Sequence, residues 1–325
     1  MTTTPPMIEV NGLTKSYGDI RALDGVSFEV RRGEVLGFLG PNGAGKTTTM
    51  KILTCFIAPT SGEARVAGVD TARDPLAVRR KIGYLPENAP LYREMRVSEY
   101  LDFAGRVRGL SPDERERGAE RVIAQCGLEE VVEQEIRTLS KGFRQRAGLA
   151  QAMLHDPEIL ILDEPTSGLD PNQIVEIREL VKSIGRERTV ILSTHHLAEV
   201  QATAGRVLII HRGRLVADGT LEELESRRGG TVYEVIVAEP EGGFDAAAAV
   251  FRPVEGVRGV AAGPAAGAGE LSLAVRGEGD ADVRAALFRA AVDADLTLLG
   301  LARRQVDLEA VFRRLTTAAP HEEVH

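Results

Sequence analysis

The sequence contains no tryptophan, and aromatic residues make up only 4% of its 325 residues. This scarcity argues against a protein that binds single-stranded nucleic acid by stacking bases on aromatic side chains. Acidic residues outnumber basic ones and give a formal net charge of −8. The chain therefore lacks the basic surface that nucleic acid or an anionic membrane attracts. No apolar run approaches the roughly 18 to 20 residues of a membrane span.

Cysteine is also scarce. The two cysteines, Cys55 and Cys126, lie in helix-like patterns, and we expect buried free thiols rather than a disulfide. Residues 1–6 contain no basic segment followed by an apolar run, so they do not resemble a secretion signal. A length of 325 residues exceeds one ordinary domain. These features predict a soluble, cytoplasmic protein of two domains.

Residues 1–224 alternate between strand-like and helix-like segments and predict an α/β domain. Aliphatic runs predict strands at residues 34–39, 81–85, 158–162, 189–193 and 206–211. Nearly continuous apolar runs indicate strands of a parallel sheet that is covered on both faces. Segments 8–10 and 26–30 instead predict antiparallel hairpins at the start of the chain.

A helical subdomain is predicted within this domain, at about residues 96–154. One of its helices follows Ser111-Pro112-Asp113-Glu114, which combines an N-cap, a proline at the first helical position and a carboxylate at the third. This helix is expected to end at Gly127 in a left-handed turn.

The composition changes after Leu224. Residues 225–230 are predicted to form a linker, and residues 231–325 a second domain that is rich in alanine and glycine and contains no lysine. Its pattern predicts a small βαββαβ sandwich with strands at 232–237, 256–261, 270–275 and 296–302 and helices at 244–251 and 282–291. A last amphipathic helix is predicted at 306–315. No catalytic constellation is evident in this domain.

A glycine-rich segment, which we call the phosphate loop, lies between a predicted strand and a predicted helix at 48–56. It consists of Gly40, Pro41, Asn42, Gly43, Ala44, Gly45, Lys46 and Thr47, followed by Thr48. The glycines allow consecutive backbone N–H groups to surround an anion, and the helix N-terminus adds partial positive charge. Lys46 is predicted to reach the outer phosphates, and Thr47 to offer its hydroxyl to Mg²⁺.

An aliphatic strand ends in two carboxylates, Asp163 and Glu164. Taken alone, such residues are typical of a solvated strand end. Beside a phosphate loop, we expect Asp163 to lie near the metal. Because side chains alternate along a strand, we expect Glu164 to face another direction, where water lies in line with the terminal phosphate.

A further helix begins at Leu139-Ser140-Lys141-Gly142-Phe143, a segment that we call the signature. Apolar residues at Phe143, Ala147, Ala150 and Leu154 follow helical spacing. The local chemistry fits either a structural N-cap at Ser140 or a second anion-binding helix start in which Ser140 and Gly142 face a phosphate.

The ordered set of motifs resembles the ATP-binding cassette (ABC) ATPases over about residues 7–219. The phosphate loop is followed by Leu-Ser-x-Gly at 139–142, Asp-Glu-Pro at 163–165, Ser-Gly-Leu-Asp at 167–170 and Ser-Thr-His at 193–195. The resemblance implies an α/β nucleotide-binding core with an inserted helical subdomain. It also implies a head-to-tail dimer in which Ser140 and Gly142 act on the partner's ATP.

The resemblance further implies roles for single residues. Glu164 would polarise the attacking water, and His195 would contact both Glu164 and the γ-phosphate. Tyr17 would stack on adenine, although it is also compatible with an ordinary hairpin aromatic. Asp170 would face the other subunit and can at the same time cap the following helix.

Two departures from the family pattern stand out. Glu87 occupies a position where glutamine is usual, so an additional metal-binding carboxylate replaces an amide donor. The signature carries Lys141 and Phe143 where glycine and glutamine are common. These variants resemble ATPase subunits of the drug, sodium and gliding-motility exporter type.

The resulting expectation is an ATPase subunit of a membrane exporter that uses ATP and Mg²⁺. Its expected partners are a second copy of itself and a polytopic permease on a separate chain, which would hold it on the inner face of the membrane; no nucleic acid is expected. Residues 88–96 are predicted either to dock the permease or to pack on the helical subdomain. The alternative function is a soluble ABC ATPase that acts on ribosomes or DNA.

Overall fold

The computed structural model of the chain describes residues 5–226, 232–264, 267–278 and 282–304. The chain divides into two compact units, Met1–Asp218 and Gly219–His325, which we call the first and second units. Residues 227–230 of the expected linker and the expected helix at 306–315 lie outside the described residues.

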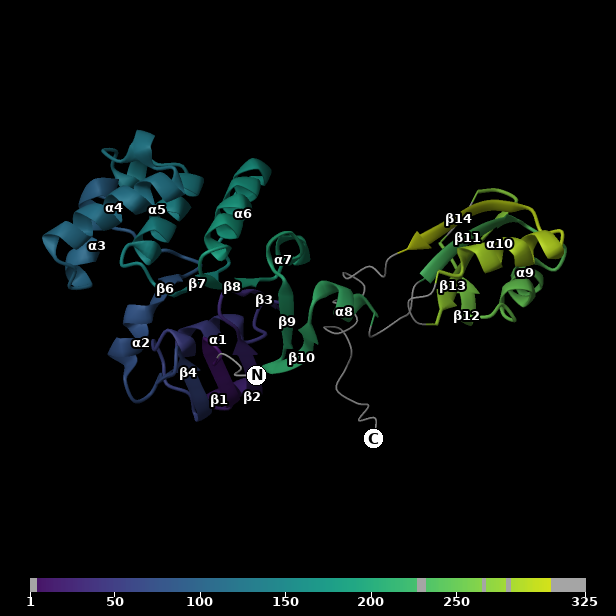
Figure 1. Cartoon of the computed structure of the whole chain (residues 1–325), viewed down its shortest axis with the longest axis horizontal. Coiled ribbons are helices and arrows are strands. Elements are labelled where there is room, and N and C mark those ends of the chain that lie inside the picture. Colours follow the sequence, from purple (N-terminus) through teal and green to yellow (C-terminus); the bar gives the residue numbers. More distant parts are fainter. Residues whose placement is uncertain (1–4, 227–231, 265–266, 279–281, 305–325) are drawn as a thin grey trace. The chain divides into compact units, whose positions relative to one another are not determined.

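The first unit is built around a six-stranded sheet of order β10-β9-β3-β8-β7-β6 (Figure 1). Its strands are β3 (Val35–Leu39), β6 (Ile82–Leu85), β7 (Ile159–Asp163), β8 (Thr189–Thr194), β9 (Arg206–His211) and β10 (Arg214–Gly219). The strands from β9 to β6 run parallel. Every residue of β7 and β8 is buried, which explains their nearly continuous apolar sequences. The five strands predicted for this sheet are confirmed, with ends that differ by one residue at most.

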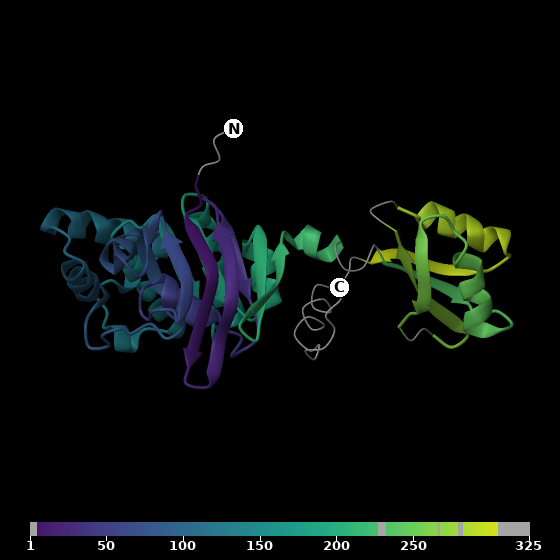
Figure 2. The ribbon, with the colours of Figure 1, turned by 90° about the horizontal axis from the view of Figure 1, so that it is seen from below.

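A second sheet, of order β2-β1-β4-β5, is antiparallel. It contains β1 (Ile8–Tyr17), β2 (Ile20–Val30), β4 (Ser61–Val66) and β5 (Val69–Asp70). The predicted hairpin is confirmed and is longer than expected, because β1 and β2 pair through register shifts up to a turn at residues 18–19. The hairpin forms the long purple ribbon pair in Figure 2. Side chains of both sheets share one apolar core with α1 (Lys46–Leu53).

The helix after the phosphate loop differs from its prediction at both ends. We expected residues 48–56, whereas α1 spans Lys46–Leu53. It begins directly after Gly45, and the chain leaves the helix at Cys55, whose φ is 59°. A left-handed residue cannot continue a right-handed helix, so the apolar residues that follow belong to the connection to β4.

The helical subdomain is formed by α3 (Val97–Val107), α4 (Pro112–Cys126) and α5 (Lys141–Met153), with short 3₁₀ turns at Glu129–Val131 and Ile136–Thr138. These helices gather on one side of the first unit, beyond α2 (Pro75–Lys81) and β6 in Figure 1. The predicted start of α4 is confirmed, because the Glu114 N–H donates to Ser111 Oγ and the Ser111 N–H donates to Glu114 Oε2. Its end is confirmed as well, since Gly127 has a φ of 61°.

The second unit is a two-layer sandwich with sheet order β12-β13-β11-β14, and all three of its strand pairings are antiparallel. Its main elements are β11 (Val232–Ala238), α9 (Gly243–Phe251), β12 (Val257–Ala262), β13 (Glu270–Gly277), α10 (Arg284–Asp293) and β14 (Leu298–Arg304). Both helices cover one face of the sheet (Figure 2), where Tyr233, Phe251 and Leu287 are fully buried. The predicted βαββαβ order is confirmed, and this strand order is that of ferredoxin-like sandwiches. The short helix α8 (Leu221–Ser226) precedes these elements.

Strand register brings several chemically active residues to one edge of the central sheet. Leu39, the last residue of β3, pairs with Thr194, and Asp163 pairs with Ser193. Ligands of open parallel sheets bind beyond the carboxyl ends of the strands, which is this edge. Among the residues that the structure describes, no helix is long and apolar enough to cross a lipid bilayer.

Candidate active site

The phosphate loop leaves the end of β3 and enters α1, as the sequence predicts. Gly45 has a φ of 111°, and a Cβ atom there would lie 2.7 Å from Leu23 Cδ2 and 2.8 Å from the Ala22 oxygen. A Cβ on Gly40 would lie 2.5 Å from the Ile210 oxygen. Both positions therefore require glycine, and the loop backbone is the surface that a phosphate would meet.

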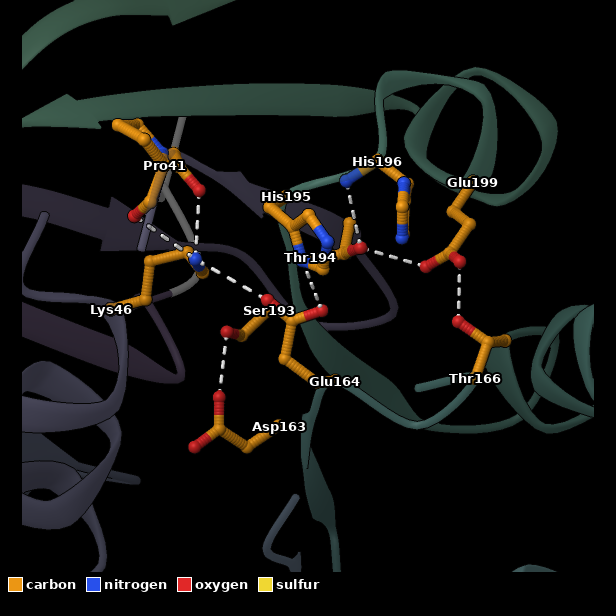
Figure 3. Close-up of polar contacts among 11 residues, drawn as sticks. Pro41, Lys46, Asp163, Glu164, Thr166, Ser193, Thr194, His195, His196 and Glu199 are labelled. Carbon is orange, nitrogen blue, oxygen red and sulfur yellow. Dashed lines mark hydrogen bonds and ion pairs between the residues drawn. The ribbon is translucent and has the colours of Figure 1, made fainter. Parts of the chain in front are cut away.

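Lys46 is buried at the start of α1, with 5% of its surface exposed. Its Nζ donates to the Gly40 oxygen at 2.7 Å and to the Pro41 oxygen at 3.3 Å (Figure 3). The same ammonium lies 3.3 Å from Glu164 Oε1. A buried cation therefore lies between the phosphate loop and the end of β7, where an anionic substrate would be held.

Asp163 ends β7, and its buried carboxylate accepts a hydrogen bond from Ser193 Oγ at 2.7 Å. Burial raises the pKa of Asp163 above its usual value, and hydrogen bonds from the Ser193 and Thr47 hydroxyls oppose that shift. The other carboxylate oxygen, Oδ2, is buried and has no hydrogen-bond partner among the described residues.

The Asp163 and Thr47 oxygens suit Mg²⁺, which prefers hard oxygen ligands. Within the described part of the chain, no group of three or more histidine, cysteine, aspartate or glutamate side chains could enclose a metal ion. This is the usual situation for Mg²⁺ in nucleotide sites, where phosphate and water supply most ligands. The unpartnered Asp163 Oδ2 and the Thr47 hydroxyl therefore fit a magnesium ion that arrives with a nucleotide.

Glu164 lies just beyond β7 and has a φ of 49°, in the left-handed region. We expected the alternation of side chains along a strand to direct Glu164 away from Asp163. The direction of its side chain is set instead by this left-handed backbone turn after the end of β7. Its Oε2 accepts a hydrogen bond from His195 Nδ1 at 2.9 Å, since an ionised carboxylate only accepts. Lys46, Glu164 and His195 thus come together from three elements that are far apart in the sequence.

The signature is placed elsewhere. Ser140 caps α5 by accepting from the Phe143 N–H at 3.2 Å, and Asp170 caps α6 (Pro171–Gly185) by accepting from the Gln173 N–H at 3.0 Å. A Cβ on Gly142 would lie 2.9 Å from Gln173 Cδ, so the two helix starts are in contact. In the described residues of the chain, no hydrogen bond or ion pair joins Ser140 or Gly142 to the phosphate loop.

Two further predicted residues are exposed. Tyr17 ends β1 with 48% of its surface exposed, and Lys15 Nζ lies 5.2 Å from the centre of its ring. Glu87 follows β6 and is exposed. Neither side chain hydrogen bonds to Lys46, Asp163 or Glu164 among the described residues. Almost half of the surface of Tyr17 is thus accessible from solvent, which stacking on a nucleotide base requires.

Sequence reasoning missed a buried polar network that adjoins this site. Glu199, in α7 (Leu197–Thr203), accepts hydrogen bonds from the hydroxyls of Thr166 and Thr194. All three side chains are buried. No motif indicates this network, because its members contact one another only after two loops and a helix have packed together.

Comparison with known proteins agrees with this geometry. Residues 23–167 match the family described as ABC transporter. The chain is 38% identical over 251 residues to the daunorubicin resistance ATP-binding protein DrrA3 of Streptomyces coeruleorubidus, which covers 77% of this chain and 79% of the relative. It is 33% identical over 312 residues to the linearmycin resistance ATP-binding protein LnrL of Bacillus subtilis, which covers 95% and 98%.

A solved structure shows the same similarity in three dimensions. The bacterial ABC transporter cassette MJ0796, described as dimeric, has a TM-score of 0.61 and 27% identity, and the match covers 66% of this chain and 99% of that one. The similarity to LnrL extends into the second unit, since it includes 95% of the chain.

Proposed function

Because the chain belongs to the ATP-binding proteins of the ABC transporter family, we propose that its site is half of a composite ATPase site that a second copy completes. The chain hydrolyses ATP to ADP and phosphate as the ATPase subunit of an ABC exporter. The observation that carries the proposal is the convergence of Lys46, Glu164 and His195 beside the phosphate loop. Within the described part of the chain, no hydrogen bond or ion pair joins Ser140 or Gly142 to the phosphate loop, and in a head-to-tail dimer both would face the partner's ATP.

Different residues of one chain have different roles in ATP hydrolysis. Backbone N–H groups at the end of the phosphate loop and the start of α1 hold the phosphates, and Lys46 neutralises their charge. Glu164 accepts a proton from the attacking water. The water oxygen bonds to the γ-phosphorus, and the bond from the γ-phosphorus to the bridging oxygen of ADP breaks. His195 orients Glu164 through the 2.9 Å hydrogen bond.

The remaining predicted residues bind the nucleotide and its metal. Thr47 and Asp163 would hold Mg²⁺, with Glu87 as an additional carboxylate, and the bound ion would neutralise charge on the phosphate oxygens. Tyr17 would stack on the adenine ring. Asp170, exposed at the start of α6, would face the partner subunit.

The transported compound crosses the membrane through a separate polytopic permease. This chain binds the permease at the inner face of the membrane. The two relatives described above are named for resistance to daunorubicin and linearmycin. We therefore assign drug-like small molecules as the class of cargo. These names favour an exporter over a soluble ATPase that acts on ribosomes or DNA.

Residues 88–96 form the candidate docking segment for the permease. The Tyr92 side chain is 53% exposed, and its ring contacts the Phe103 ring in α3 at a centroid distance of 5.1 Å. Leu91 and Met95 pack instead against the core of the helical subdomain. The segment is thus anchored by two residues and presents an aromatic side chain to a partner helix.

The second unit would add dimer contacts or regulate the ATPase. LnrL shares this unit, whereas the match to MJ0796 covers only 66% of the chain. Deletion of residues 227–325 tests the role. We expect weaker dimerisation or altered turnover; unchanged dimerisation and ATPase activity would contradict it.

Purification of the tagged chain from the membranes of its native host tests the transporter assignment. We expect a polytopic protein to copurify in a fixed ratio and to change the rate of ATP hydrolysis. If all of the active ATPase is recovered without a membrane protein, the exporter assignment is wrong.

A further inference from the structure

Glu199 is a buried acidic residue to which the mechanism above gives no role. It lies in α7, immediately after the loop that carries His195, and only 2% of its surface is exposed. Among the residues that the structure describes, its two side-chain hydrogen-bond partners are threonine hydroxyls and not cationic groups. Burial of a carboxylate with only neutral partners lowers stability, so the residue is not explained as a stabilising element.

The first hydroxyl belongs to Thr194, the residue before His195. Thr194 Oγ1 donates to Glu199 Oε2 at 2.8 Å and accepts from the His196 N–H at 3.1 Å (Figure 3). A hydroxyl has one proton to donate, so its donation to Glu199 leaves the oxygen lone pairs for His196. Glu199 thereby fixes the backbone on both sides of His195.

The second hydroxyl belongs to Thr166, two residues after Glu164. Thr166 Oγ1 donates to Glu199 Oε1. The segment between them is a tight turn, in which the Ser167 N–H donates to the Glu164 oxygen at 3.1 Å. Glu164 itself has a φ of 49°, a conformation that persists only where the surroundings hold it. Glu199 holds the far side of this turn.

These contacts form a closed ring. On one side, His195 Nδ1 meets Glu164 Oε2 at 2.9 Å. On the other side, the loops that carry these two residues are joined through Thr194, Glu199 and Thr166 (Figure 3). The distance between Glu164 and His195 is therefore set by both bridges.

We propose that Glu199 is a positioning residue for ATP hydrolysis, which holds the Glu164 loop and the His195 loop at a fixed separation. A carboxylate suits this role because it only accepts, so both threonine hydroxyls must point toward it. A glutamine of the same shape would present an N–H group to one threonine and remove that constraint. The inference rests on the proposed roles of Glu164 and His195.

The test compares Glu199→Gln with wild type in the full-length protein. We expect kcat for ATP hydrolysis to fall by about tenfold to a hundredfold, as small displacements of reacting groups do. The KM for ATP and the Kd of a non-hydrolysable ATP analogue should stay within about twofold, because the phosphate loop is untouched. The matched control is Glu187→Gln, an exposed glutamate between α6 and β8, which should leave kcat unchanged.

A double-mutant cycle with His195→Ala separates positioning from a general structural effect. If Glu199 acts through the Glu164–His195 pair, Glu199→Gln should cost little once His195 is already alanine. A wild-type kcat for Glu199→Gln, or an equal fold-loss in both backgrounds, would overturn the proposal.

Two threonine variants decide the matter if Glu199→Gln does not fold. Thr194→Ser keeps the hydroxyl and should retain kcat within about twofold, whereas Thr194→Val loses it and should lower kcat about tenfold. Equal activity of the two variants would overturn the proposal. The variant Glu164→Gln tests separately whether Glu164 is the general base. Normal hydrolysis by this variant would show that it is not, whatever the result for Glu199.

Discussion

The two units of the chain bury different kinds of side chain. Among the residues that the structure describes, the buried charged ones are Lys46, Asp163, Glu164, Arg188 and Glu199, and all of them lie in the first unit. All except Arg188 are among the residues whose polar contacts are drawn in Figure 3. The core of the second unit is apolar apart from groups such as the Tyr233 hydroxyl, which accepts a hydrogen bond from the Val283 N–H at 3.2 Å.

This difference separates function from stability. Buried charges with incomplete partners cost free energy of folding, whereas close-packed apolar side chains supply it. We therefore expect changes at the edge of the central sheet to alter hydrolysis with little loss of stability. We expect changes in the core of the second unit to do the opposite.

The largest effect is expected for Glu164→Gln. It should lower kcat by about 10²- to 10⁴-fold, the usual contribution of a general base, while ATP binding is retained. The variant should accumulate as an ATP-bound dimer, because hydrolysis would no longer separate the subunits. Steady-state ATPase assays and size-exclusion chromatography with ATP measure both effects; near-normal turnover would contradict the assignment.

The converse change is Phe251→Ala in the second unit. Phe251 is fully buried, and loss of its ring should lower the free energy of unfolding of this unit by about 3–5 kcal/mol. Calorimetry of the full chain should show a lower Tm for the unfolding transition of the second unit and an unchanged Tm for the first unit. ATPase activity should be preserved at temperatures below the lowered transition. The control is Phe288→Ala, because Phe288 is 53% exposed and should change stability by about 0.5 kcal/mol or less.

A smaller change in stability is expected for Asp163→Asn, which should stabilise the fold where Phe251→Ala destabilises it. The pKa of Asp163 is raised in the folded state, so its ionisation destabilises the fold as the pH rises through that pKa. At neutral pH, we expect asparagine to stabilise the nucleotide-free first unit and to raise its Tm, because the amide carries no charge that burial penalises. The gain should disappear below about pH 4, where the wild-type carboxyl is also neutral, and hydrolysis with Mg²⁺ should be lost. An equal Tm at all pH values would contradict this account.

Sequence patterns predicted most of the fold because its elements are locally determined. Continuous aliphatic runs located the buried strands, and cap residues such as Ser111, Gly127 and Asp170 located helix ends. The end of α1 was wrong because the left-handed turn at Cys55 has no signal in a non-glycine residue.

The candidate site was predicted only in part, for a similar reason. Lys46, Asp163 and Glu164 lie in short motifs whose spacing carries the chemistry. The left-handed φ of Glu164 and the bridge from Thr166 to Glu199 arise from tertiary packing between segments 33 residues apart. No local pattern records such a contact.

The central claim is that two copies of the chain form two composite sites. Its most direct test mixes Lys46→Ala subunits with Ser140→Asp subunits. Aspartate also caps a helix, so Ser140→Asp keeps the start of α5 while its charge repels the partner's phosphates. Each variant alone should be inactive.

In a mixed dimer, one composite site carries both lesions and the other carries neither. Equal mixing should therefore restore about a quarter of wild-type ATPase activity, since about half of the dimers are mixed and each has one intact site. If mixed dimers form and hydrolysis stays absent, each chain completes its own site, and the account is wrong.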